Sequence, residues 1–157
     1  MIKRMIVLFT FLSVLISFAT LAASSSVKMP NGWDYVTNIN HGKLDYENAT
    51  KYGSSGSFIS LLGTKKTNTA QIGSPLGIQC SGFCQIILFI DNDKPKETKA
   101  YFDNGVLSFD LPNELLNSLI NSSEFRVSLT VRNNESKTFV FDMTGVPFKG
   151  NVPLNIQ

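Results

Sequence analysis

The segment between residues 125 and 143 constrains the fold most, because apolar and polar residues alternate there in two consecutive runs. The apolar positions fall on every second residue: Phe125, Val127, Leu129 and Val131, then Phe139, Phe141 and Met143. A period of two is typical of a strand that buries one face, whereas a helix spaces its apolar residues three or four positions apart. A polar turn at 133–136 separates the runs. The sequence therefore predicts an antiparallel hairpin with one face in a hydrophobic core.

A second hairpin is predicted around Asn104-Gly105, a pair that tolerates the positive φ values of a tight type I′ turn. A two-residue turn determines which side chains lie opposite each other. The expected pairs are Phe102 with Leu107 and Ala100 with Phe109 on one face, with Tyr101 and Ser108 on the other.

The remaining segments complete an all-β fold. Further strands are predicted at 33–37, 57–62, 69–72 and 85–90, and the last of these is apolar on both alternating sets, as in a central strand. Residues 112–121 change to helical spacing, with Leu115, Leu116 and Leu119 on one stripe. The stretch 38–57 predicts mainly loop, with room for one short strand near Leu44 to Tyr46, and the tail from Gly145, with its two prolines, predicts a frayed or loosely docked end. We expect an antiparallel β-sandwich of about eight strands with one short helix.

The first 23 residues have the pattern of a secretory signal peptide. Lys3 and Arg4 precede an apolar stretch that ends in the small residues Ala22 and Ala23. The alternative is a membrane anchor, but the stretch is short for a bilayer and diluted by hydroxyl side chains. We expect cleavage after Ala22 or Ala23, leaving 24–157 as one periplasmic or secreted domain that does not insert into the membrane. Without the leader the chain holds twelve basic and twelve acidic side chains, a balance that argues against nucleic acid as a partner.

Cys80 and Cys84 are the two cysteines of the chain. In an oxidising compartment such thiols pair, so we expect a structural disulfide. A loop this small stabilises the fold by only about 2 kcal/mol in the chain-entropy account. The alternatives are a redox dithiol, which usually has the spacing Cys-x-x-Cys, and a metal site, which lacks ligands because His41 is the only histidine. We expect no metal and no cofactor.

The residues that could carry chemistry are few. His41 lies in an Asn- and Gly-rich segment, where an exposed turn residue is the alternative to a catalytic base. Trp33 and Tyr35 share one face of the first predicted strand, either as core anchors or as a platform for a partner. We expect no enzymatic activity, and Trp33, Tyr35 and His41 are the candidate residues for binding a protein partner.

Several motifs together resemble the invasion-associated locus B family of exported bacterial proteins. They are Gly32-Trp33-Asp34-Tyr35-Val36, Pro75-Leu76-Gly77-Ile78, the pair Cys80 and Cys84, Leu115-Leu116-x-x-Leu119, the run from Phe125 to Val131, and a Phe-rich last strand that ends at Gly145-Val146. The resemblance implies a periplasmic or surface β-sandwich linked to host-cell interaction and to virulence, and it carries over no catalytic residues.

The functional expectation is an exported bacterial binding protein. Two alternatives remain open within binding and structural roles. One is a periplasmic immunity or enzyme-inhibitor protein that uses the loops between Asn38 and Gly56. The other is a fimbrial or envelope structural subunit, which the lack of an aromatic residue in 151–157 disfavours.

Overall fold

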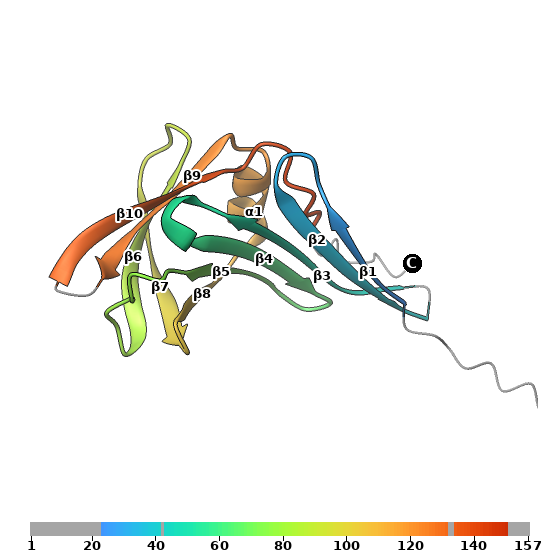
Figure 1. The fold of residues 1–157 in the computed structure, drawn as a ribbon, viewed down its shortest axis with the longest axis horizontal. Coiled ribbons are helices and arrows are strands. Elements are labelled where there is room, and N and C mark those ends of the chain that lie inside the picture. Colours follow the sequence, from blue (N-terminus) through green and yellow to red (C-terminus); the bar gives the residue numbers. More distant parts are fainter. Residues whose placement is uncertain (1–22, 42, 132–133, 151–157) are drawn as a thin grey trace, which may run out of the picture.

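The computed structural model describes residues 23–41, 43–131 and 134–150, and it shows ten strands joined in one antiparallel sheet (Figure 1). The elements are β1 (Ala23–Lys28), β2 (Trp33–Asn40), β3 (Lys43–Tyr52), the 3₁₀ turn η1 (Ser54–Gly56), β4 (Phe58–Thr64), β5 (Asn68–Gly73), β6 (Gly82–Ile90), β7 (Lys96–Asp103), β8 (Val106–Asp110), α1 (Asn113–Ile120), β9 (Glu124–Val131) and β10 (Glu135–Asp142). The strand order is β1-β2-β3-β4-β5-β8-β7-β6-β9-β10.

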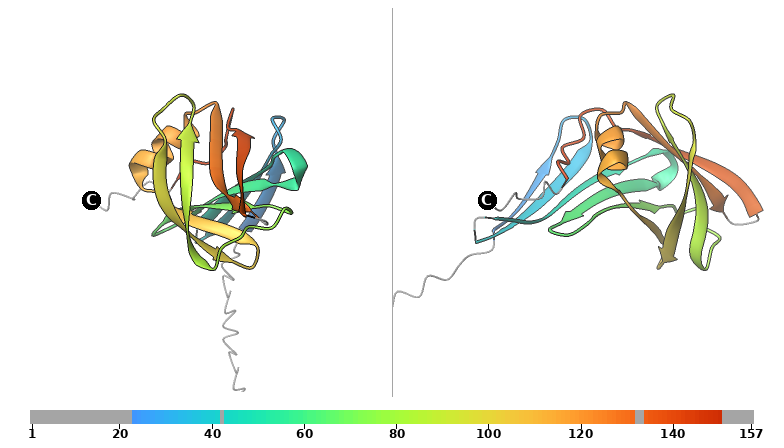
Figure 2. Two further views of the ribbon diagram at one scale, coloured as in Figure 1. Left: turned by 90° about the vertical axis from the view of Figure 1, so that its left-hand side faces the viewer. Right: turned by 180° about the vertical axis from the view of Figure 1, so that it is seen from behind.

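The prediction of an all-β antiparallel fold with one short helix is confirmed. The strands form one continuous sheet instead of two separate layers, and this sheet curls so that its inner face encloses the core (Figure 2). A right-handed twist at every strand accumulates over ten strands and produces such curling. Lys51 of β3 donates a hydrogen bond of 2.9 Å to Asp142 of β10, so strands from distant places in the sheet meet where it curls. Most of 38–57, predicted as loop, forms the end of β2 and all of β3.

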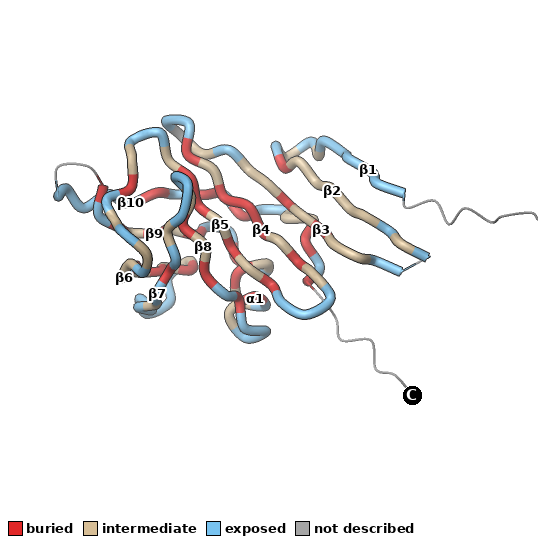
Figure 3. The backbone as a smooth tube through the Cα atoms, turned by 90° about the horizontal axis from the view of Figure 1, so that it is seen from below, coloured by how far each residue is buried: buried red, intermediate tan, exposed pale blue. Residues whose placement is uncertain are grey.

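The core lies on the inner face, where every second residue of the middle strands is buried. Burial is concentrated in these strands, while β1 is exposed along its whole length (Figure 3). Leu116 and Leu119 of α1 are buried, so the helix packs its leucine stripe on the core as its spacing predicts. The largest fully buried side chains include Trp33, Phe125, Phe141, Ile59, Leu61, Ile72, Ile86, Leu88 and Leu107.

The hairpin of β7 and β8 follows the predicted register only in part. Asn104 and Gly105 have φ of 49° and 84°, and Phe102 lies opposite Leu107 as expected. The predicted pairing of Ala100 with Phe109 is wrong. After three pairs β8 leaves β7 and continues along β5, where Phe109 lies opposite Ala70.

The residues after β10 cross the inner face as a C-terminal strap, which we define as residues 143–150. The side-chain amide of Asn31 donates to the carbonyl oxygens of Thr144 and Gly145. Phe148 is only 3% exposed, and a Cβ at Gly63 would lie 3.0 Å from its ring, so the absence of a side chain there makes room for it. The expectation of a frayed end is therefore wrong for 145–150, while 151–157 lie outside the described residues.

Of the predicted leader, 1–23, residues 1–22 lie outside the described residues, and Ala23 begins β1. Among the described residues, no helix has the length and apolar character needed to cross a membrane.

Candidate interaction surface

Five apolar side chains lie toward one end of the outer face of the sheet, and we call them the outer aromatic band. They are Tyr52, Phe58, Phe83, Tyr101 and Val106. Phe83 is 73% exposed, Tyr52 66% and Tyr101 49%. Large apolar side chains gathered on an exposed face are typical of interaction surfaces.

The register of the strands brings the band together. Phe83 lies opposite Tyr101, and their rings meet edge to face with centroids 5.3 Å apart. Tyr52 lies opposite Phe58, with ring centroids 6.3 Å apart. The ladders then run from Phe58 through Gly73 to Val106, which lies diagonally across from Tyr101. The band therefore crosses the outer face from β3 to β6.

Gly73 makes room for the ring of Phe58. A Cβ built on Gly73 would lie 2.1 Å from that ring, closer than any real contact. The ring therefore covers the glycine backbone, in the way that aromatic residues compensate glycines in neighbouring strands. Any larger residue at position 73 would move Phe58 and reshape the middle of the band.

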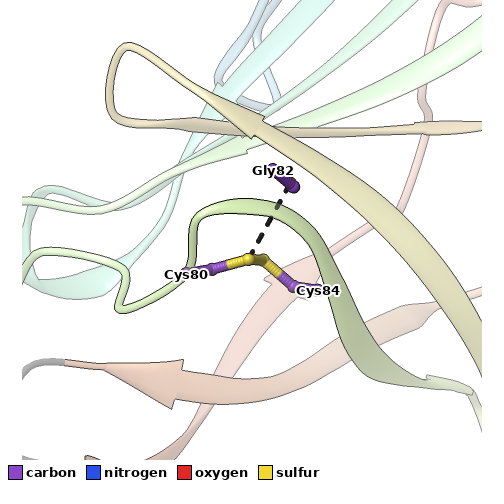
Figure 4. Close-up of a disulfide and its surroundings, with 3 residues drawn as sticks. All are labelled: Cys80, Gly82 and Cys84. Carbon is purple, nitrogen blue, oxygen red and sulfur yellow. Dashed lines mark hydrogen bonds between the residues drawn. A yellow bond between two sulfur atoms is a disulfide. The ribbon is translucent and has the colours of Figure 1, made fainter.

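The predicted disulfide between Cys80 and Cys84 is confirmed (Figure 4). Phe83 lies between the two cysteines in the sequence. Their Cα atoms are 5.8 Å apart, within the usual range for a disulfide. Gly82 has a φ of 73°, and its carbonyl oxygen lies 3.8 Å from Sγ of Cys80. Because the bridge joins residues on both sides of this turn, it restrains the backbone that presents Phe83. Phe83 also lines a pocket of about 340 Å³ together with Ile78 and Leu129.

A polar ladder borders the band. Asn48 donates to Ser60 over 2.8 Å, and Thr50 donates to Asn48 over 2.7 Å. Lys99 and Asp103 flank Tyr101 on the same strand face. The surroundings thus combine exposed aromatic rings with hydrogen-bonding and charged groups, the composition expected of a surface that contacts another protein.

The three residues proposed from the sequence do not come together. Trp33 is fully buried in the core, which matches its alternative role as an anchor and leaves it no surface to offer a partner. The hydroxyl of Tyr35 donates to Oε2 of the buried Glu47 over 2.7 Å. Burial, and then this bond to Glu47, raise the pKa of Tyr35 well above its ordinary value. His41 is exposed in the β2–β3 turn with a φ of 52°, at the other end of β2 from Trp33.

The band could be found only in part from the sequence. Tyr101 is predicted on the face opposite to the core, and the structure confirms this placement. Phe83 lies between the two cysteines, so an aromatic residue inside a small disulfide loop was the available signal. The proximity of Tyr52 and Phe58 depends on the β3–β4 pairing, which follows a segment predicted as loop.

Other polar side chains have structural partners. The carboxylate of Asp91 accepts hydrogen bonds from the backbone N–H groups of Ser123 and Glu124, so it joins the end of β6 to the start of β9. In the described part of the chain, no group of three or more His, Cys, Asp or Glu side chains is placed to hold a metal ion.

Comparisons with known proteins yield a likeness of general fold. No family model matches the chain, and no curated protein matches its sequence. A solved structure, invasion associated protein B from Bartonella henselae, aligns with 80% of this chain and 87% of its own, at 12% sequence identity and a TM-score of 0.41. No family, function or residue role is transferred from it.

Proposed function

We propose that this protein is an exported binding protein that recognises a protein partner through the outer aromatic band and has no catalytic activity of its own. The observation that carries the proposal is the exposure of Tyr52, Phe83 and Tyr101 on one face of a sheet whose other face holds the core. Aromatic side chains supply large contact areas and contribute strongly to protein interfaces.

The disulfide supports the exported location. Disulfides persist in the periplasm and outside the cell but are rare in reducing compartments. The bridge also lies where the partner would bind, because it restrains the turn that presents Phe83. A surface that is ordered before binding loses less conformational entropy when the complex forms.

Three kinds of partner fit this proposal, and identification of the partner separates them. A receptor on host cells would give the protein a role in invasion. An enzyme whose activity falls on binding would make it an immunity or inhibitor protein. A second copy of the chain, or another envelope subunit, would make it structural.

Site-specific photo-crosslinking tests the proposal. Replacing Phe83 or Tyr101 by p-benzoylphenylalanine keeps an aromatic side chain in the band. The matched control carries the same group at Val140, which is 45% exposed on the outer face of β10, away from the band. In the cells that make the protein, or with the cells they meet, we expect one defined adduct at positions 83 and 101 and none at 140. Equal adducts at all three positions, or an adduct at 140 alone, would contradict it.

A further inference from the structure

The sheet is split between β7 and β8. β7 pairs with β6 from Lys96 to Phe102, but with β8 only from Tyr101 to Asp103. Beyond that point β8 follows β5, and the chain continues into α1. One edge of β7, from Lys96 to Ala100, therefore has no neighbouring strand within the described sheet.

The backbone groups that face this split can be assigned. The Asn104-Gly105 turn makes Asp103 and Val106 a hydrogen-bonded pair, and bonded pairs alternate along an antiparallel ladder. Lys99 and Glu97 are therefore the residues whose backbone N–H and C=O point into the split. Both residues are exposed.

A pocket of about 370 Å³ lies in the split. Its β7 wall runs from Lys96 to Lys99, and its opposite wall is formed by Asp110, Pro112, Glu114 and Leu115. Leu88 also lines it, so the pocket reaches the apolar side of the sheet. An open strand edge beside a partly apolar pocket is the arrangement that binds extended peptides by strand addition.

We propose that this split binds an extended segment of a partner protein, antiparallel to β7, in the place that β8 leaves empty. The register defines the segment. A residue opposite Thr98 points inward toward Leu88 and Leu115, so an apolar side chain fits there. Its neighbours lie outward, opposite Lys99 and Glu97. Opposite charges pair favourably across strands. From its N-terminus, the segment therefore has an acidic residue opposite Lys99, an apolar residue opposite Thr98 and a basic residue opposite Glu97.

The site borders the outer aromatic band at Lys99 but contains none of the band's side chains, and it goes beyond the proposed function. The probe is the peptide acetyl-Thr-Glu-Leu-Lys-Thr-amide, and its control, acetyl-Thr-Lys-Leu-Glu-Thr-amide, has the same composition with the charges exchanged. In titrations followed by NMR of the whole purified protein, we expect the probe to shift the amide signals of Glu97 and Lys99 saturably. The control should bind at least about fivefold more weakly.

Two further comparisons test the backbone pairing. N-methylation of the peptide's Glu removes an N–H that would bond to Lys99, whereas N-methylation of its Leu alters an N–H that points away. We expect the first to weaken binding about fivefold or more, and the second far less. In the protein, Lys99→Pro removes the N–H facing the split without breaking the β6–β7 ladder, and Lys99→Ala is its control, so the Pro variant should bind more weakly than the Ala variant.

Phe83→Ala should leave peptide binding unchanged, which separates this site from the band. The proposal is overturned if the probe produces no saturable shift, if both charge orders bind equally, or if the two methyl groups weaken binding equally. The N-methyl comparison uses the unaltered protein and therefore does not depend on the folding of the proline variant.

Discussion

Both faces of the curled sheet carry aromatic side chains, but those on the inner face are buried and those on the outer face are exposed. The inner face holds Trp33, Phe125 and Phe141, none more than about 1% exposed, and the strap adds Phe148. The outer face holds Tyr52, Phe83 and Tyr101, which are about half exposed or more. The curl of the sheet, α1 and the strap cover the inner aromatics, whereas no described segment covers the outer ones.

This difference separates stability from recognition. A buried aromatic side chain stabilises the fold through the apolar surface that it removes from water. An exposed aromatic side chain keeps most of its apolar surface in water when the chain folds. That surface leaves water only when a partner protein covers it. The same substitution made on both faces should therefore affect unfolding on the inner face and binding on the outer face.

The largest expected difference comes from replacing one phenylalanine on each face. Phe148→Ala removes a buried ring that packs at Gly63 and should lower the free energy of unfolding by about 3–5 kcal/mol. Phe83→Ala removes an exposed ring and should cost less than about 1 kcal/mol. Urea unfolding of the two variants and the wild type measures both values. Equal losses of unfolding free energy in the two variants would show that Phe148 in the strap stabilises the fold no more than Phe83 in the exposed band does.

Removal of the disulfide is expected to cause the next largest loss of unfolding free energy. Replacing Cys80 and Cys84 by Ser opens a five-residue loop and should cost about 2 kcal/mol in urea unfolding. The wild type unfolded in the presence of dithiothreitol is the control and should match the variant. Because the bridge restrains the turn that presents Phe83, photo-crosslinking at position 83 should fall even where the variant remains folded. Unchanged crosslinking would show that the disulfide does not contribute to binding at position 83.

A single hydroxyl on each face gives the third comparison. Tyr35→Phe removes one of two donors to Oε2 of the buried Glu47, the other being the backbone N–H of Lys149, and should cost about 1.5–3 kcal/mol, because a buried carboxylate loses its shorter hydrogen bond. Tyr101→Phe removes an exposed hydroxyl and should be nearly neutral. Thermal or urea unfolding measures both variants. A neutral Tyr35→Phe would mean that Glu47 finds another donor.

Local patterns predicted the elements of the inner face well, because the alternation that marks a strand also marks its buried side. The hairpin at Asn104-Gly105, the hairpin of β9 and β10 and the leucine stripe of α1 were found in this way, although Glu135 and Ser136, predicted in the turn, already belong to β10. Trp33 could not be assigned to the core or the surface, because an aromatic residue on a strand fits either face until its neighbours are known.

The features that the sequence did not reveal depend on contacts between distant segments. Docking of the strap requires Phe148 to meet Gly63, eighty-five residues earlier. The split beside β7 arises because β8 pairs with β5, and the band arises from the pairing of β6 with β7. No period within one strand encodes these partners, so the candidate residues Trp33, Tyr35 and His41 were chosen by type and not by position.

The smallest expected effect concerns the ion pair between Lys51 and Asp142, where β3 and β10 meet. Lys51 donates to Asp142, and so do the side chain and the backbone N–H of Thr144, and these bonds lower the pKa of Asp142 from 3.8 to about 2. A pKa that is lower in the folded state stabilises the fold above the unfolded pKa. This contribution is therefore fully present above about pH 4 and is lost as the pH falls from 4 to 2.

Asp142→Asn tests this contribution. The carboxylate is well exposed, so solvent screens the pair and the cost near neutral pH should stay below about 1 kcal/mol. The difference in unfolding free energy between variant and wild type should shrink as the pH falls below 4 and vanish only once the pH is below 2, where the carboxyl of the folded state is protonated too. Asp103→Asn, in the exposed β7–β8 hairpin, is the control for the same replacement away from this ion pair. A difference for Asp142→Asn that persists unchanged below pH 2 would mean that Asp142 stabilises the contact between β3 and β10 through interactions that do not depend on its charge.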